Sequence, residues 1–88
     1  MTRNKSFEIV KVNNDYMAVP TGKTAAGYDG VVTLSESGAF LLKALDRDRT
    51  VEELADLLTA EYEVDRGTAL KDIALIVQDF ERLGLIEG

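Results

Sequence analysis

The 88-residue sequence contains no cysteine, no histidine and no tryptophan, and it has a single proline. The missing cysteine and histidine exclude disulfides, thiolate nucleophiles, Ser-His-Asp catalysis and zinc sites with the usual ligands. No apolar run approaches the ~20 residues that span a bilayer, and no signal-peptide core follows the first residues. We therefore expect a cytoplasmic protein without a metal or cofactor.

Positive charge is also scarce. The chain has 10 Lys and Arg against 16 Asp and Glu, which gives a net charge of -6. Residues 1–30 carry four cations and three anions, a net of +1, whereas residues 31–88 carry six and thirteen, a net of -7. This balance argues against contact with nucleic acid or an anionic membrane, and it suits a partner with a positive surface.

What the sequence does have is apolar residues, at 45% of the chain, which favours one globular domain over residues 1–88. Residues 1–6 are polar, and we expect them to be disordered. Runs of β-branched and aromatic residues predict three strands, at residues 7–12, 16–19 and 30–34. Helical spacing of apolar residues predicts three helices, at residues 36–45, 51–62 and 66–83. The order indicates an α+β fold, a winged-helix-like β-β-β-α-α-α arrangement with a three-stranded antiparallel meander followed by a three-helix bundle.

Helix ends are marked by capping residues. Ser35 and Asp65 are predicted N-caps, and Thr50 with Glu53 forms the pattern of a capping box. Gly84 fits the left-handed position that closes the last helix.

The last predicted helix carries an unexpected leucine. On a helical wheel, one side is apolar and is the predicted core face, made of Ile73, Ile76, Val77, Phe80 and Leu83. The nearly opposite side holds Lys71, Leu75, Gln78 and Arg82. Leu75 is either an ordinary exposed leucine or, with its neighbour Ala74, part of a shallow apolar groove for a partner.

The predicted strand at residues 30–34 is also unusual. Alternation and the apolar helix that follows place Val32 and Leu34 toward the core. The strand has no charge, no lysine and no proline, which are the devices that usually protect a sheet edge. It is either central in the sheet or covered, or it is an open edge that accepts a peptide. An open edge could also pair with a second copy, so we expect a monomer or a weak dimer.

Three stretches, in this order, resemble PqqD-like proteins. Residues 30–42 (GVVTLSESGAFLL) resemble the family's G-x-x-x-L-N-E-T-G-A-x-L-W, departing at Ser35, where the family often has Asn. Residues 50–54 (TVEEL) and 61–65 (EYEVD) resemble T-x-E-E-L and E-Y-x-V-D, and residues 72–86 resemble D-V-x-x-F-L-x-x-L followed by G-L-L. The resemblance runs from about residue 7 to residue 87.

The resemblance implies a function. Such domains recognise the leader of a ribosomally synthesised precursor peptide, bind it as an extra strand against the third helix, and present it to a modifying enzyme, often a radical S-adenosylmethionine enzyme. In the name-giving case the product is pyrroloquinoline quinone. Carried onto this sequence, the peptide-binding residues are Gly30, Val31, Val32, Thr33, Leu34, Lys71, Ala74, Leu75, Gln78 and Arg82. Ala74 and Leu75 would receive apolar leader side chains, and Lys71 would pair with an acidic one.

Three alternatives stay open. A winged-helix arrangement can bind DNA, but residues 65–83 hold three cations and four anions, a net of -1 on the would-be recognition helix. An enzyme is disfavoured because the carboxylates look like solvated helix faces. A general protein adaptor differs from the peptide-binding hypothesis only in its partner, and the acidic surface of Glu52, Glu53, Asp56 and Glu61 is its candidate docking face.

Overall fold

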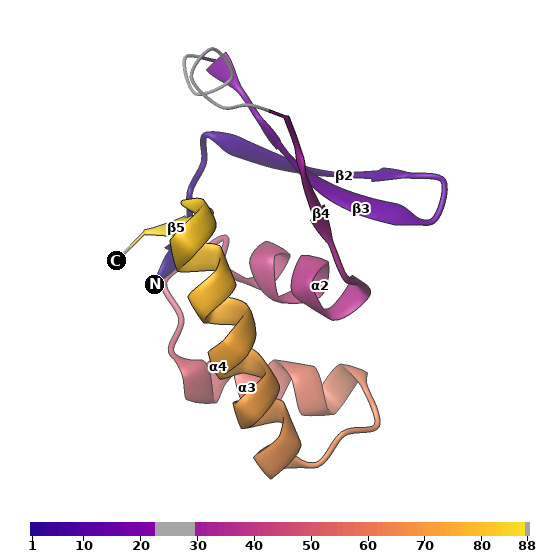
Figure 1. Cartoon of the computed structure of the whole chain (residues 1–88). Coiled ribbons are helices and arrows are strands. Elements are labelled where there is room, and N and C mark those ends of the chain that lie inside the picture. Colours follow the sequence, from indigo (N-terminus) through magenta and orange to yellow (C-terminus); the bar gives the residue numbers. More distant parts are fainter. Residues whose placement is uncertain (23–29, 88) are drawn as a thin grey trace.

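The computed structural model describes residues 1–22 and 30–87, and it places a main sheet on one side of a group of helices, with a small second sheet near the two termini (Figure 1). The strands are β1 (Thr2–Arg3), β2 (Phe7–Val12), β3 (Asp15–Pro20), β4 (Val32–Leu34) and β5 (Ile86–Glu87). The helices are α2 (Glu36–Ala44), α3 (Val51–Glu61) and α4 (Arg66–Leu83). The predicted α+β fold, a three-stranded antiparallel sheet with three helices, is confirmed. No helix in the described residues is long and apolar enough to cross a membrane.

The main sheet has the strand order β2-β3-β4, with both pairings antiparallel. A two-residue turn joins β2 and β3, where Val12 is opposite Asp15. Asn13 adopts a left-handed φ of 58°, which asparagine tolerates better than most residues. The third predicted strand is shorter than expected, because Gly30, at φ 91°, and Val31 precede the paired segment.

Side chains cap each helix at its N-terminus. The Ser35 hydroxyl accepts from the Gly38 amide at 3.0 Å, and both hydrogen bonds of the Thr50–Glu53 capping box are present. Asp65 accepts from the Thr68 amide, and Gly84 ends α4 in the left-handed conformation. Since these bonds satisfy amides that have no partner within the helix, local sequence fixes where each helix begins.

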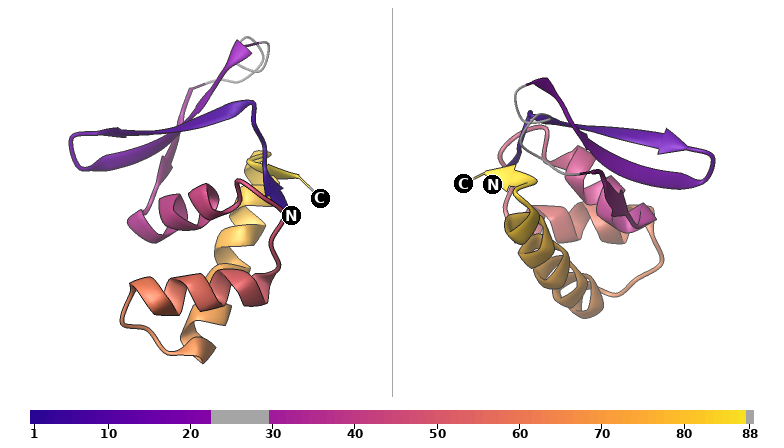
Figure 2. Two further views of the ribbon diagram at one scale, coloured as in Figure 1. Left: turned by 180° about the vertical axis from the view of Figure 1, so that it is seen from behind. Right: turned by 45° about the horizontal axis from the view of Figure 1, so that its top comes forward.

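The core lies between the inner face of the sheet and the three helices. Its largest fully buried side chains are Leu41, Leu42, Leu45, Leu54, Ile73 and Leu85. The sheet contributes Phe7, Ala18 and Leu34, one from each strand. Figure 2 shows from two further directions that the helices gather on one side of this sheet.

The expectation that residues 1–6 are disordered is wrong for this fold. β1 pairs with β5 in a second, two-stranded sheet, and the Met1 amino group binds the Asp48 carboxylate. The Arg3 amide donates to the Leu45 carbonyl at 2.7 Å. These partners lie more than 40 residues away in the sequence, so local composition gives no sign of them.

Candidate functional site

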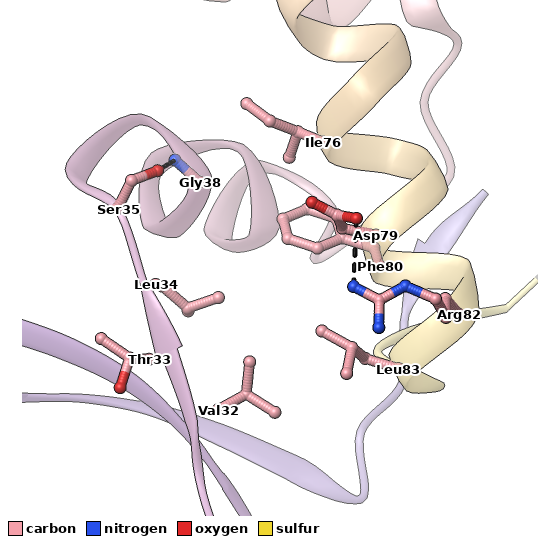
Figure 3. Close-up of a pocket in the computed structure, with 10 residues that line it drawn as sticks. All are labelled: Val32, Thr33, Leu34, Ser35, Gly38, Ile76, Asp79, Phe80, Arg82 and Leu83. Carbon is pink, nitrogen blue, oxygen red and sulfur yellow. Dashed lines mark hydrogen bonds and ion pairs between the residues drawn. The ribbon is translucent and has the colours of Figure 1, made fainter.

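A pocket of about 250 Å³ separates β4 from the C-terminal half of α4 (Figure 3). Strand, cap and helix all contribute to its lining, which consists of Val32, Thr33, Leu34, Ser35, Gly38, Ile76, Asp79, Phe80, Arg82 and Leu83. Its floor is apolar and its charged groups lie on the helix. The arrangement resembles a ligand pocket, which is mostly apolar with a few polar groups at defined positions.

The strand side presents alternate side chains. Figure 3 shows Val32 and Leu34 pointing toward α4 and Thr33 pointing away. Leu34 is buried, Val32 is half-buried against the core and Thr33 is exposed. The predicted inward orientation of Val32 and Leu34 therefore agrees with the structure.

The backbone of β4 has an open edge. Because a two-residue turn closes the β2–β3 hairpin, Val12 and Asp15 form a hydrogen-bonded pair. Alternation along β3 then directs Ala18 and Tyr16 toward β4, where they pair with Val32 and Leu34. Thr33 lies between these pairs, so its N–H and C=O point outward. Among the described residues, no strand pairs with this edge.

The helix side is formed by one flank of α4. Ile76, Asp79 and Leu83 are spaced i, i+3 and i+7 and therefore share a face. Asp79 and Arg82 form an ion pair at 3.2 Å on the pocket rim, where both side chains are mostly exposed. The pair is weak, because exposed ion pairs contribute ~0–1 kcal/mol. Either partner can therefore exchange it for a charged ligand group.

The structure brings four predicted site residues together at this pocket: Val32, Thr33, Leu34 and Arg82. Gly30 and Val31 are exposed and lead into β4. The predicted helix residues Lys71, Ala74, Leu75 and Gln78 are also exposed, but they do not line the pocket. Leu75 is 64% exposed, more than any other large hydrophobic residue that the structure describes.

Sequence reasoning missed the pocket's helix floor. The helical wheel places Ile76, Phe80 and Leu83 on the core face, but a wheel alone does not determine which flank of the helix faces the strand. Phe80 is indeed buried, whereas Ile76 and Leu83 are only half-buried at the border of the core. One signal in the sequence could have indicated them: on the helical wheel of α4, Ile76 and Leu83 lie at the edge of the apolar side, next to the polar residue Asp79.

A second pocket, of about 220 Å³, is lined by Tyr16, Glu36, Phe40, Lys43, Glu61 and Tyr62. Burial, followed by the nearby carboxylates of Glu36 and Glu61 and by Tyr16, raises the pKa of Tyr62 above its ordinary value. Phe40 packs edge-on against Tyr62 at 5.6 Å, and the Lys43 ammonium lies 5.2 Å from the Tyr16 ring. The side chains that line this second pocket contact one another rather than pointing into open space. The pocket beside β4 is therefore the better candidate site.

The β4 pocket combines outward backbone groups with apolar side chains. Within the described residues, no group of three or more His, Cys, Asp or Glu side chains could hold a metal ion. Asp79 is exposed and forms an ion pair with Arg82. An outward backbone edge beside an apolar pocket is instead the geometry that captures an extended peptide.

Two solved structures share this fold. A structure of TbiB1 in complex with the TbiA(beta) leader peptide has a TM-score of 0.77 and 20% identity, with coverage of 100% of this chain and 96% of that one. A lasso peptide synthetase B1 complexed with the leader peptide has a TM-score of 0.73 and 20% identity, with coverage of 98% and 95%. No curated protein matches.

One family model, described as coenzyme PQQ synthesis protein D (PqqD), matches residues 17–86. The match includes every residue that lines the β4 pocket, from Val32 to Leu83. The resemblance seen in the sequence is confirmed: the chain belongs to the PqqD family.

Proposed function

We propose that the chain is a recognition domain that binds the leader of a ribosomally synthesised precursor peptide and presents it to a modifying enzyme. The observation that carries the proposal is the outward N–H and C=O of Thr33 beside the pocket of α4. Family membership supports it, as do two neighbours of the same fold that were solved with leader peptides.

The leader adds to the open edge of β4. An added strand lies ~4.8 Å from β4, which places it above the pocket between β4 and α4. Its backbone pairs with Thr33, and in a longer strand with Val31, two residues earlier. Side chains on one face of the leader then enter the pocket over Ile76 and Leu83. Backbone pairing supplies affinity and the pocket supplies specificity.

The exposed row on α4 extends this site. Leu75, Asp79 and Arg82 are spaced i, i+4 and i+7, so Leu75 continues the face that bears the pocket rim. Lys71 lies one turn further, and Ala74 and Gln78 flank the row. A leader that runs past Leu34 along α4 reaches Leu75 with an apolar side chain and Lys71 with an acidic one. All ten residues predicted from sequence thus belong to the proposed site.

The partner enzyme is proposed to be a radical S-adenosylmethionine enzyme, as the family resemblance implies, and pyrroloquinoline quinone is one product of such a pathway.

The alternative function, recognition of nucleic acid, is less compatible with the charge of α4. Its three cations are Arg66, Lys71 and Arg82, and residues 65–83 carry a net charge of -1, so this helix has no excess of positive charge to offer to phosphates.

The test is a titration of the ¹⁵N-labelled chain with the leader encoded beside its gene. We expect amide shifts concentrated in residues 31–35 and 75–83. Absence of binding at ~100 µM leader, or shifts restricted to α3, would refute the proposal. Binding of random duplex DNA at low salt would favour the DNA-binding alternative instead.

A further inference from the structure

The sheet has a second surface, the face that points away from the helices. Its members follow from the register: Val10 is opposite Met17, which is opposite Thr33, and every second residue from these shares their side. We call this set the outer face; it comprises Glu8, Val10, Val12, Asp15, Met17, Val19 and Thr33.

The outer face is apolar although no described helix covers it. Val12 is 50% exposed, and Val10, Met17 and Val19 are only half-buried. The core is built from the opposite side of the same strands, through Phe7, Ala18 and Leu34, with Ile9, Tyr16 and Val32 packed against it. Figures 1 and 2 show the helices on that opposite side.

An antiparallel sheet with one face in water normally carries polar residues on that face. Here four of seven outer-face residues are large and apolar: Val10 is opposite Met17, Val12 follows Val10 two positions along β2, and Val19 follows Met17 two positions along β3. The sequence of β2, FEIVKV, is apolar on both faces of the sheet, because the consecutive residues Ile9 and Val10 point to opposite sides. A contiguous apolar patch of this kind marks an interaction surface.

The charge of the outer face indicates which kind of partner can bind it. The only charged residues of the outer face are Glu8 and Asp15, at opposite ends, so the face carries a charge of -2. A second copy stacked on it would add two more carboxylates at the ends of the patch, and neither face has a cation to pair with them. A partner with an apolar patch bordered by Lys or Arg would neutralise them.

We propose that the outer face is the docking surface for the peptide-modifying enzyme, through an apolar patch with a basic rim. The partner's identity rests on the proposed function. β4 connects the two sites, because its backbone edge is the proposed leader position while the Thr33 side chain belongs to the outer face. An enzyme bound there sits beside the leader without competing for the edge.

Methionine offers a specific reporter. The chain has two methionines: Met17 in the outer face, and Met1, which packs against the core. With ¹³C-methyl-methionine labelling, we expect the purified modifying enzyme from the same gene cluster to shift or broaden the Met17 methyl signal. The leader peptide alone should leave that signal in place while shifting the amides of residues 31–35.

Variants supply the matched comparison. Val10→Lys with Val12→Lys adds two positive charges to the outer face, and Glu52→Gln with Ala60→Lys adds two to exposed positions of α3. The outer-face variant should lose at least tenfold in enzyme affinity and keep leader affinity within twofold, whereas the α3 variant should bind both as the unmodified chain does. Amide spectra confirm that each variant is folded.

Three results would overturn the inference. These are unchanged enzyme affinity in the outer-face variant, loss of enzyme affinity in the α3 variant alone, or a dimer in sedimentation that the outer-face variant abolishes. Failure of the proposed function is distinguishable, because it appears as a leader that does not bind even the unmodified chain.

Discussion

Replacement of Thr33 by proline tests the role of the β4 edge. Proline removes the backbone N–H, and at position 33 that N–H points away from β3. Proline is tolerated on an edge strand when its N–H side faces solvent, so the fold should survive. The proposed leader strand, however, loses one hydrogen-bond donor.

The expected loss follows from the value of one hydrogen bond. A net contribution of ~0.5–1.5 kcal/mol corresponds to leader binding that is weaker by about 2- to 13-fold. Fluorescence anisotropy with a labelled leader measures this, and urea denaturation measures stability in parallel.

Two further variants complete the comparison. Thr33→Val keeps the N–H and should bind the leader as the unmodified chain does. Val32→Pro removes an N–H that points toward Ala18 within the sheet, so it should lower the free energy of unfolding more than Thr33→Pro. Normal leader affinity in folded Thr33→Pro would refute addition of the leader at this edge.

Other predictions concern α4 and the helix caps. Leu75→Glu places a charge on the proposed leader row but not in the core, so leader affinity should fall while the unfolding midpoint in urea stays the same; unchanged affinity would show that Leu75 is only an exposed leucine. Thr50→Ala removes the acceptor for the Glu53 amide and should cost about 1 kcal/mol in urea denaturation without changing leader affinity. Hydrogen bonds from the Thr68 side chain and backbone lower the pKa of Asp65, so its stabilisation is complete above the unfolded pKa of ~3.9 and is lost as pH falls through the folded value. Asp65→Asn keeps a capping oxygen and should remove this acid dependence from thermal melts; an unchanged pH profile would contradict that assignment.

The helices and their caps could be predicted because their signals are local. The bonds that begin α2 and α3 join residues three positions apart, Ser35 with Gly38 and Thr50 with Glu53. The alternation that places Val32 and Leu34 inward is equally local.

Contacts between distant segments could not be predicted in the same way. β1 pairs with β5 across more than 80 residues, and a polar hexapeptide contains no information about that partner. The flank of α4 that meets β4 depends on how the helix packs, so Ile76 and Leu83 looked like ordinary core residues. The outer face was missed because Val10 and Met17 look like normal strand residues until the register places them on one side.

Amide hydrogen exchange at Thr33 tests the central claim most directly. In the free chain the Thr33 N–H points outward and should exchange quickly, while the Val32 N–H, directed toward Ala18, is protected. Saturating leader should slow exchange at Thr33 and leave Val32 protected as before. If Thr33 exchanges at the same rate with the leader bound, the leader does not add to β4.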